Sequence, residues 1–482
     1  MFSESFRYPS LPDEYLKEYL LPEIYQWSLS NGLIMYPPDF KPESTSIAPT
    51  TVFPTTLPKE SFNKAIDVQK DYNELYAKIS QDQLGWLTSE AAELAKSDPD
   101  FTGKLWDTYL KASKIGIKQK LRLGLFRSDY LIDKSANEIK QVEFNTVSVS
   151  FGGLSTKVGE LHQFLNQSGK YDVAKGLEYY KYVPVSDSDV KLAEGLAKAV
   201  DRYDSISGNA CVLFVVQNGE RNVFDQRILE YNLLKLHGIK SKRMTFDEIP
   251  ELTKLGEDNR LLIKATNEEV AVVYFRSGYA PTDFKTDKDW DTRLYLETSY
   301  AIKAPDLLTQ LSGAKKIQQL LTEEIYLRKF VKEDDIVKKL TSTFVNIYPL
   351  DNTSLGNEGK RLAFESPEKF VLKPQREGGG NNIYKEDIPK FLNSIDEGEW
   401  NAYVLMELIK PEETMHNIII RGDEYFKEAI ISELGIFGYI LFDDDTIYNN
   451  EYAGWLLRSK FNSSNEGGVA AGFGCVDSVV LY

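Results

Sequence analysis

A short apolar run, Cys211-Val-Leu-Phe-Val-Val-Gln217, opens the part of the sequence that decides the fold class. It has the length of a buried strand, and the segment Asn222–Leu236 after it has helical spacing, with Phe224, Ile228 and Tyr231 expected on one side. Further strand-like segments lie at 240–245, 261–264 and 269–275, and a helical one at 292–302. Alternating strands and helices predict an α/β (α+β) fold with a largely parallel sheet.

Two loops leave predicted strands of this region at their carboxyl ends. They are Asn218-Gly-Glu-Arg-Asn222 and Arg276-Ser-Gly-Tyr279, and each combines arginine with glycine. Ligands of parallel sheets bind beyond the carboxyl ends of the strands. Both loops are therefore candidate binding loops.

Outside this region the pattern is mixed. Helical periodicity covers 61–120, and residues 1–60 indicate a helix followed by irregular segments. Strands are expected at Leu121–Phe126, Lys140–Ser150, Phe370–Lys373, Ala402–Ile409 and Ala429–Glu433.

The composition is that of a globular protein, and the 482 residues allow two or three domains. The formal net charge of −16 argues against nucleic acid or an anionic membrane as the main partner. Only two cysteines occur, no signal peptide is visible and no apolar run is long enough to span a membrane, which together predict a cytoplasmic protein.

The segment Gln141–Val147 alternates polar and apolar residues. Because residues i and i+2 of a strand point to one face, Glu143 and Asn145 are expected to lie side by side. A carboxylate and an amide oxygen together suit Mg²⁺. The same alternation also fits an ordinary half-exposed strand, and the segment alone favours that interpretation.

A glycine-rich run, Lys373-Pro-Gln-Arg-Glu-Gly-Gly-Gly-Asn-Asn382, lies between two predicted strands. Adjacent glycines let backbone N–H groups approach a phosphate, Lys373 can meet its charge and Glu377 can hold a metal. A flexible linker is the alternative. The flanking strands and the closely spaced charges favour the phosphate site.

Near the C-terminus, Arg458 and Lys460 share one face of any extended segment, and a small-residue loop follows at 466–472. A substrate site and a charged surface turn fit this pattern equally well. Lys315 opens an apparent helix. The three histidines lack metal or nucleophile spacing, and no P-loop or dinucleotide-binding motif occurs.

Several of these stretches together resemble eukaryotic glutathione synthetase over nearly the whole chain. The matching stretches are 126–130, 142–146 continuing through 150–153, 220–222 with 224–226, 275–276 with 278–279, 373–382, 431–435 and 467–472. The resemblance implies an ATP-grasp-type core at 1–210 and 313–482, an inserted α/β substrate-binding domain at 211–312, and a lid region at 330–420 that carries the glycine-rich loop. It also implies a homodimer.

The same resemblance implies a reaction and its cofactor. ATP would phosphorylate the cysteinyl carboxylate of γ-glutamylcysteine, and the amine of glycine would then displace phosphate to give glutathione. Mg²⁺ would be held by Glu143, Asn145 and Glu377. The expected catalytic residues are Arg458, Lys460 and Lys315.

The remaining site residues are implied by family position. Those expected to bind ATP are Glu143, Lys315, Lys373, Glu377, Gly378, Gly379, Gly380, Asn381, Asn382, Tyr384, Met406, Glu407, Leu408, Ile409, Glu433, Lys460 and Glu466. Those expected to bind the peptide substrates are Arg127, Val147, Ser148, Val149, Ser150, Glu220, Arg221, Asn222, Gln226, Arg276, Ser277, Gly278, Tyr279, Arg458, Val469 and Ala470.

Two other functions stay open at this point. One is a different ATP-dependent amide ligase of the same fold, and the other is a non-catalytic nucleotide-binding or scaffold protein. The scaffold hypothesis predicts lost metal ligands or cations, yet Glu143, Asn145, Glu377, Arg458 and Lys460 are present. The pair Ala470-Ala471 resembles the glycine-using members of the family and predicts glycine over β-alanine as acceptor.

Overall fold

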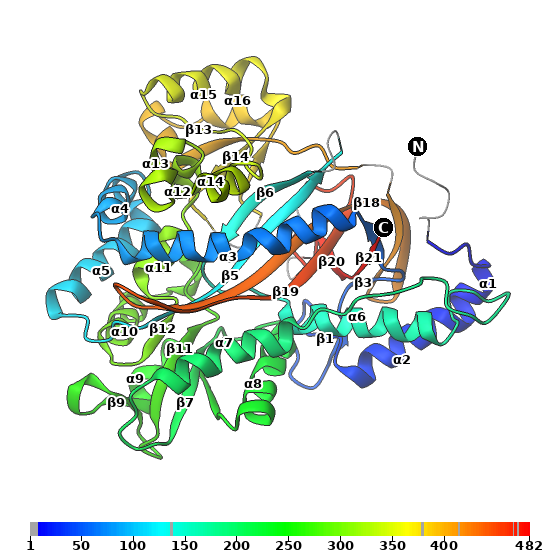
Figure 1. The fold of residues 1–482 in the computed structure, drawn as a ribbon, viewed down its shortest axis with the longest axis horizontal. Coiled ribbons are helices and arrows are strands. Elements are labelled where there is room, and N and C mark those ends of the chain that lie inside the picture. Colours follow the sequence, from blue (N-terminus) through cyan, green and yellow to red (C-terminus); the bar gives the residue numbers. More distant parts are fainter. Residues whose placement is uncertain (1–7, 135–137, 377–379, 413–414, 466, 470–471) are drawn as a thin grey trace.

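The computed structural model describes residues 8–134, 138–376, 380–412, 415–465, 467–469 and 472–482. Helices and strands alternate over much of the chain, which confirms the mixed α/β class (Figure 1). Among the described residues no helix is both long and apolar enough to cross a membrane.

A large mixed sheet runs through the molecule. Its main path is β17 (His416–Arg421), β3 (Thr50–Thr51), β20 (Gly474–Asp477), β19 (Ile447–Phe461), β18 (Glu424–Phe442), β5 (Arg122–Asp133), β12 (Ile302–Ala304), β11 (Glu269–Phe275), β10 (Leu261–Ile263) and β9 (Thr253–Leu255). Strand β6 (Glu138–Asn145) pairs with β5, while β7 (Ala210–Val215) lies between β11 and β8 (Ser241–Met244).

Strands β7, β8, β11 and β12 of the 211–302 region are parallel, as the sequence predicts, whereas β10 pairs antiparallel with both β11 and β9. Strand β11 pairs in parallel with β12 and β7, and β7 pairs in parallel with β8. Alternate side chains of β7 and β11 enter different cores, so these strands are buried on both faces. Strand β12 also pairs in parallel with β5, which joins the region to the rest of the sheet.

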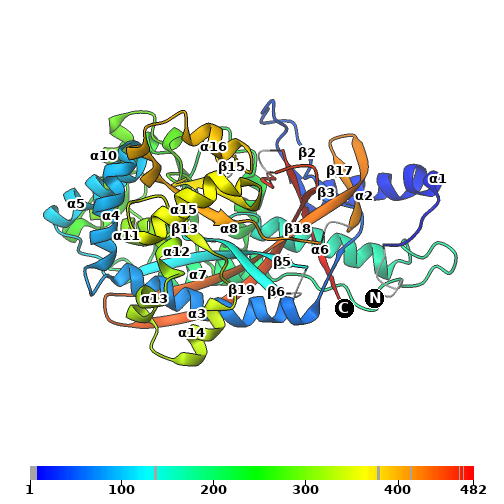
Figure 2. The same cartoon turned by 90° about the horizontal axis from the view of Figure 1, so that it is seen from above.

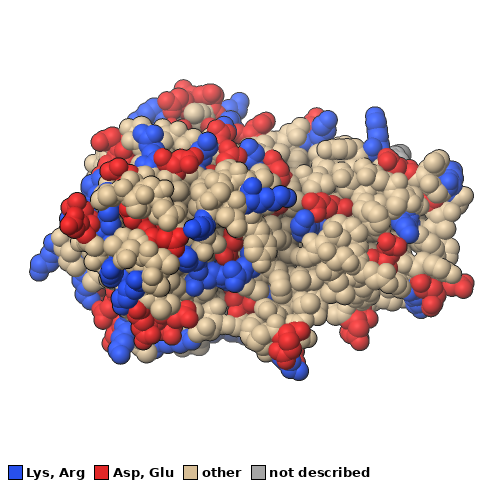
Figure 3. Space-filling model, turned by 90° about the horizontal axis from the view of Figure 1, so that it is seen from below, with Lys and Arg blue, Asp and Glu red and all other residues tan. Residues whose placement is uncertain are grey.

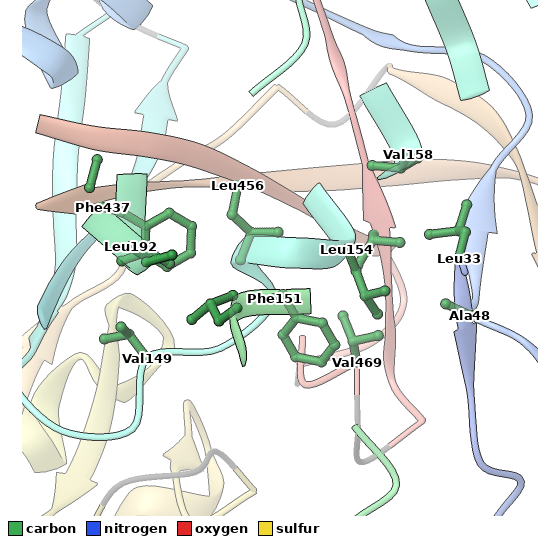
Figure 4. Close-up of a cluster of buried hydrophobic side chains, with 14 of the residues drawn as sticks. Leu33, Ala48, Val149, Phe151, Leu154, Val158, Leu192, Phe437, Leu456 and Val469 are labelled. Carbon is green, nitrogen blue, oxygen red and sulfur yellow. The ribbon is translucent and has the colours of Figure 1, made fainter. Parts of the chain in front are cut away.

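The long antiparallel strands β5, β18 and β19 are covered by helices on both faces. On one face α3 (Lys59–Gln81) packs against Phe126, Ile436 and Trp455. On the other, α6 (Gly152–Gln167) and α7 (Ser188–Arg202) pack against Phe437 and Leu456 (Figures 1 and 4). These apolar faces fix the positions of the strands that carry the site.

A smaller sheet lies at the edge of the molecule, in the order β13 (Ile347–Pro349), β16 (Tyr403–Glu407), β14 (Phe370–Pro374) and β15 (Ile383–Tyr384). Helices α15 (Ser354–Glu365) and α16 (Asp387–Leu392) cover one side of it and share a core with Leu372 and Leu405 (Figure 2). The glycine-rich run begins at Lys373, near the end of β14, so this small α/β unit carries it.

The other elements complete the layers. Helices α1 (Asp13–Tyr15) and α2 (Leu21–Asn31) with strands β1 (Ile34–Met35), β2 (Ser46–Ile47) and β4 (Thr55–Leu57) form the N-terminal part. Strand β21 (Val479–Leu481) pairs with β4. The remaining α-helices are α4 (Trp86–Ser97), α5 (Lys104–Ile115), α8 (Val223–His237), α9 (Glu248–Leu252), α10 (Asp287–Thr298), α11 (Leu307–Ser312), α12 (Lys315–Leu321), α13 (Glu324–Phe330) and α14 (Asp334–Thr341).

The strand expected at Lys140–Ser150 is shorter than its sequence pattern indicates. Strand β6 ends at Asn145, and Ser148 and Phe151 adopt φ angles of 53° and 71°. These left-handed conformations interrupt an extended chain. The segment 146–151 is therefore a loop, which leads into α6.

The buried side of α8 also differs from the prediction. Tyr231 is 63% exposed, whereas Gln226, Leu229 and Leu233 are buried. Arg243 donates hydrogen bonds to Gln226 and Glu230, so polar side chains of α8 are satisfied inside the protein. The most apolar side of the helix is for this reason not the buried one.

Three other elements have different bounds from those expected. The strand at Leu121–Phe126 continues to Asp133, and the strand at Ala429–Glu433 is part of the much longer β18. The helix expected at 292–302 is α10, Asp287–Thr298. Charged residues interrupt the apolar pattern of β5 and β18, but Arg127 pairs with Asp129 on β5 and Glu433 of β18 pairs with Arg458 of β19, so the strands can continue through them.

Charged side chains of both signs are interspersed on the face seen in Figure 3. Despite the net charge of −16, the acidic residues on that face do not form one continuous acidic patch.

A buried polar network ties the C-terminal strand β20 to the N-terminal segment. The Asp477 carboxylate accepts hydrogen bonds from the hydroxyls of Thr51 (2.6 Å), Thr55 (2.6 Å) and Ser459 (2.5 Å). Close by, His162 contacts the Thr51 carbonyl through Nε2 and the Ser478 hydroxyl through Nδ1. Both Asp477 and His162 are fully buried.

Burial shifts the pKa values of these two groups in opposite directions. It raises the pKa of Asp477 to about 6, against the hydroxyl donors, and lowers the pKa of His162 to about 4. Between about pH 4 and about pH 6, Asp477 is protonated in the folded state but ionised in the unfolded chain, so its contribution to stability falls as the pH rises. His162 is neutral in the folded state but still protonated in the unfolded chain, so its contribution to stability increases over the same range. Each effect is on the order of 3 kcal/mol, so in the native protein they largely offset one another.

Single variants should separate the two effects. Relative to the native protein, Asp477→Asn is expected to make the free energy of unfolding rise with pH across this window, and His162→Gln to make it fall. Urea unfolding at pH 4, 5 and 6.5 measures both slopes. Stability curves parallel to that of the native protein for both variants would refute this account.

Candidate active site

A cavity of about 420 Å³ lies between the small sheet and the end of the large sheet. This volume falls within the range of about 300–1,000 Å³ that is typical of small-molecule sites. Its walls combine residues of β5, β6, β18 and β19, the loop after β6, the start of α12 and the small sheet. One space is therefore shared by segments that the sequence places far apart.

The floor of the cavity consists of charged residues on three neighbouring strands. Along β5 the inward residues change from Leu123 and Leu125, which contact the core beneath α6 and α7, to Arg127 and Asp129. The same change occurs on β19, where Leu456 contacts the core and Arg458 is the next residue on the same face of the strand. The apolar end of this face of the sheet packs against α6 and α7, and its charged end borders the cavity.

These charges are paired with one another. Arg127 binds the Asp129 carboxylate through two nitrogens, at 2.6 and 2.7 Å. Arg458 donates to Asp129 at 3.0 Å and also to Glu433 across the β18–β19 pair. Lys460 lies on the same face of β19 and borders the cavity, where its Nζ donates to the Asn465 carbonyl at 2.6 Å.

The Glu143 carboxylate has a different environment from that of Glu433. Burial alone raises the pKa of a carboxyl, but Lys315, Lys373 and Arg458 outweigh it and hold the pKa of Glu143 well below its usual value. For Glu433 burial dominates, with Asp129 and Glu143 adding to it, and its pKa is raised despite Arg458. Glu143 is consequently ionised at neutral pH and available to a cation.

Two buried lysines border the cavity. Lys315, at the start of α12, donates to Glu143 at 2.9 Å. Lys373, near the end of β14, donates to the Val142 carbonyl at 2.9 Å. Among the described residues, seven cations border the cavity, against three carboxylates (Glu143, Glu407 and Glu433): Lys315, Lys373, Arg127, Arg376, Lys385, Arg458 and Lys460. The site is thus locally basic in an acidic protein and suits an anion.

The donor set fits Mg²⁺. Glu143 and Asn145 both border the cavity, and Asn145 directs its amide nitrogen to Asp129 and to the Arg127 carbonyl, which leaves its oxygen for another partner. In the described ranges no group of three or more His, Cys, Asp or Glu side chains could hold a metal. Mg²⁺ in nucleotide sites needs only one or two carboxylates plus phosphate and water.

The small sheet provides an apolar wall. Val371, Met406 and Leu408 border the cavity, and Tyr384 lies beside them in the same cluster. The chain from Glu407 to Ile409 leaves β16 along this wall. A planar apolar group would fit beside these side chains, with backbone groups at its edge.

The loop after β6 is held in place by Asp225 of α8. Its carboxylate accepts from the backbone N–H groups of Phe151, Gly153 and Leu154 at 2.7–3.1 Å. In addition, Val469 of the C-terminal loop is buried against Phe151 and Leu154 (Figure 4). These contacts fix Ser148 and Ser150 at the cavity wall.

The two arginine loops lie together at the carboxyl ends of β7 and β11, as predicted. Arg276 donates to the Ser150 hydroxyl at 2.6 Å and to the Val149 carbonyl. Glu220 accepts from Gln226 and from the backbone of Asn222. The Asn222 Oδ1 atom is buried and has no hydrogen-bond partner among the residues that the structure describes.

The predicted site residues separate into three groups. Those that border the cavity are Arg127, Glu143, Asn145, Val147, Ser148, Val149, Ser150, Tyr279, Lys315, Lys373, Asn381, Asn382, Tyr384, Met406, Glu407, Leu408, Ile409, Glu433, Arg458, Lys460 and Val469. Those that do not border it are Glu220, Arg221, Asn222, Gln226, Arg276, Ser277, Gly278 and Gly380. Glu377, Gly378, Gly379, Glu466 and Ala470 lie outside the described residues.

Sequence reasoning missed four acidic residues that position these groups. Asp129 lies beneath Arg127 and Arg458, and Asp225 anchors the loop after β6. Asp283 accepts from the backbone of Gly278 and Tyr279. Asp98 binds Arg376, in the first half of the glycine-rich run, through two oxygens at 2.5 and 2.7 Å. The one local signal was Arg127-Ser-Asp129, which places opposite charges on one face of a strand.

Comparison with known proteins identifies the family. A family model described as the eukaryotic glutathione synthase ATP-binding domain matches residues 14–481. The glutathione synthetase large chain of Schizosaccharomyces pombe is 41% identical and covers 94% of this chain and 96% of its own. Glutathione synthetase of Homo sapiens is 40% identical over 90% of each chain.

The fold is also that of a solved structure. A glutathione synthetase-like effector from Globodera pallida superimposes with a TM-score of 0.76, at 22% identity, over 98% of each chain. The family model and the relatives at about 40% identity show that this chain is an ATP-dependent ligase. It belongs to the eukaryotic glutathione synthetase family.

Proposed function

We propose that the chain joins γ-glutamylcysteine to glycine at the expense of ATP, giving glutathione, ADP and phosphate. The observation that carries the proposal is the single cavity bordered both by the small sheet and by the cations of β5, β19, α12 and β14. A nucleotide and a peptide can meet there without leaving the protein. The domain bounds at 210/211 and 312/313 and the ATP-grasp class of the core remain part of the proposal.

The nucleotide is placed against the small sheet. Val371, Met406 and Leu408 receive the base, and the backbone from Glu407 to Ile409 gives polar contacts at its edge. Lys315 and Lys373 neutralise the phosphates, and the glycine-rich run supplies backbone N–H groups. When bound, Mg²⁺ supplies further neutralisation of the phosphate oxygens from a site formed by Glu143 and Asn145, with Glu377 as the third ligand.

The peptide is placed at the charged floor. Arg127 and the loop that carries Ser148 and Ser150 hold its carboxylates, and Tyr279 borders the same wall. Arg276 supports this loop through Ser150. Asn222 does not border the cavity, but its buried oxygen has no hydrogen-bond partner among the described residues and suits the α-amino group of a γ-glutamyl end that reaches beyond the cavity.

In the first step a cysteinyl carboxylate oxygen attacks the γ-phosphorus of ATP, and ADP departs with the electrons of the broken P–O bond. Phosphoryl transfer depends mainly on alignment and on neutralisation of charge. Lys315, Lys373 and Arg458 supply fixed positive charge around this position. The product is an acyl phosphate.

In the second step the glycine nitrogen attacks the acyl carbon. The C–O bond to the phosphate breaks, the phosphate departs with that oxygen, and the amine loses a proton. Arg458 and Lys460, side by side on β19, stabilise the oxygen charge that develops.

The proposal includes a homodimer in the cytoplasm. Tyr231 and Leu234 are 63% and 57% exposed on the outer side of α8, where a second copy can cover them. Both cysteines are free and buried, which fits a reducing compartment.

The test is a coupled assay of phosphate release with purified protein, ATP and Mg²⁺. Phosphate release is expected only when γ-glutamylcysteine and glycine are both present. One phosphate should be released for each glutathione formed. Release with another dipeptide or amine but not this pair would favour a different amide ligase. Nucleotide binding without any product would favour the scaffold hypothesis.

The acceptor is tested in the same assay with β-alanine in place of glycine. Because the family pattern at Ala470-Ala471 is that of the glycine-using members, kcat/KM is expected to be higher for glycine. Equal values for the two amines would contradict this part of the proposal.

A further inference from the structure

Asp129 lies directly beneath the cavity and is fully buried. It is absent from the described residues that border the cavity. Its Oδ1 atom accepts from Arg127 Nε at 2.6 Å. Its Oδ2 atom accepts from the terminal nitrogens of Arg127 (2.7 Å) and Arg458 (3.0 Å) and from the Asn145 amide (3.0 Å). One carboxylate thus makes four hydrogen bonds to three residues of the site.

The three partners have different tasks. Arg127 faces the peptide, Arg458 faces the bond that forms, and Asn145 faces the metal position. We propose that Asp129 is a positioning residue that sets these three side chains relative to one another and thereby couples peptide binding to metal binding. The proposal rests on the proposed function.

The chemistry requires a carboxylate at this place. An ionised carboxylate accepts about four hydrogen bonds, and the four donors around Asp129 use that capacity. Asparagine has one acceptor oxygen, and its amide nitrogen would face donor nitrogens of Arg127 or Arg458. Without the negative charge, the guanidinium groups of Arg127 and Arg458 would also repel each other. The partners would therefore lose their common position in Asp129→Asn.

The opposite strand is adapted to this pair. Gly435 of β18 lies across from Asp129 in the register. A Cβ atom at this position would lie 2.9 Å from both Arg127 Cδ and Asp129 Oδ1. A side chain here must displace the Arg127–Asp129 pair, so Gly435→Ala disturbs its geometry without removal of a charge.

Asp306 offers a matched control. It is a buried carboxylate that pairs at 2.9 Å with Arg122, at the far end of the same strand β5, and it caps α11. Neither Asp306 nor Arg122 is among the described residues at the cavity. Asp306→Asn thus removes a buried Asp–Arg pair of the same kind without a change in the site.

The experiment compares the native protein with Asp129→Asn, Gly435→Ala and Asp306→Asn in the glutathione-forming assay. The KM for γ-glutamylcysteine and the half-saturating Mg²⁺ concentration are expected to rise together by about 10- to 100-fold in the first two variants. The KM for ATP at saturating Mg²⁺ should stay unchanged, because the side chains that hydrogen-bond to Asp129, those of Arg127, Arg458 and Asn145, are not assigned to the nucleotide. Asp306→Asn should keep all three constants.

Two results would overturn the inference. The first is that Asp129→Asn keeps the native values of both KM constants and of the half-saturating Mg²⁺ concentration. The second is that all three constants rise equally in Asp129→Asn and rise by the same factor in Asp306→Asn. If Asp129→Asn does not fold, Gly435→Ala decides in the same way. A native protein that forms no glutathione would refute the proposed function instead, so the two failures are distinguishable.

Discussion

Glu143→Gln is expected to lower kcat by about 10²- to 10³-fold and to raise the half-saturating Mg²⁺ concentration. Glutamine has nearly the same shape but no charge. Lys315, which donates to Glu143 at 2.9 Å, would lose its anionic partner, and the metal position would lose its one described carboxylate. The lowered pKa of Glu143 means that the native side chain is charged across the working pH range.

The matched control is Glu138→Gln, at the exposed start of the same strand, where Glu138 pairs with Lys140 at 3.6 Å. It should keep the native kcat and Mg²⁺ dependence. Steady-state rates over a Mg²⁺ titration measure both variants, with the melting temperature as a check of folding. Native rates in Glu143→Gln would remove this residue from the metal site.

Arg458→Met is the second large effect, with kcat/KM for the peptide expected to fall by about 10³-fold. The substitution keeps a long side chain but removes the cation that contacts both Glu433 and Asp129. Because Arg458 counters the rise in the pKa of Glu433, that pKa should rise further in the variant. The fall in kcat/KM therefore has two causes: Arg458 no longer contacts the substrate, and Glu433 and Asp129 lose their shared cation.

Arg361→Met is its control. Arg361 also pairs with two carboxylates, Glu358 and Glu365, but on the exposed surface of α15. Exposed pairs contribute little to stability. Native kinetics are expected for Arg361→Met, and an equally small effect of Arg458→Met on kcat/KM would contradict the role given to β19.

Part of this site could be predicted from local sequence. Alternation in a strand placed Glu143 and Asn145 on one face, and both border the cavity. The two arginine loops follow strands that are parallel in the structure. These predictions succeed because the period of a strand and the direction of neighbouring strands are local properties.

The rest depends on pairings between distant segments. Arg458 meets Asp129 only because β5 and β19 both pair with β18, across more than 300 residues of sequence. Asp225 reaches the loop after β6 in a similar way. Local sequence could not predict which side of α8 is buried, because Gln226 and Glu230 are satisfied by a neighbouring strand.

The central claim is that the peptide carboxylate is phosphorylated before the amide forms. It is tested most directly with γ-glutamylcysteine labelled with ¹⁸O in the cysteinyl carboxylate, followed by mass analysis of the phosphate. An acyl phosphate requires that each phosphate released carries one labelled oxygen from the peptide. Unlabelled phosphate formed together with glutathione would contradict the mechanism.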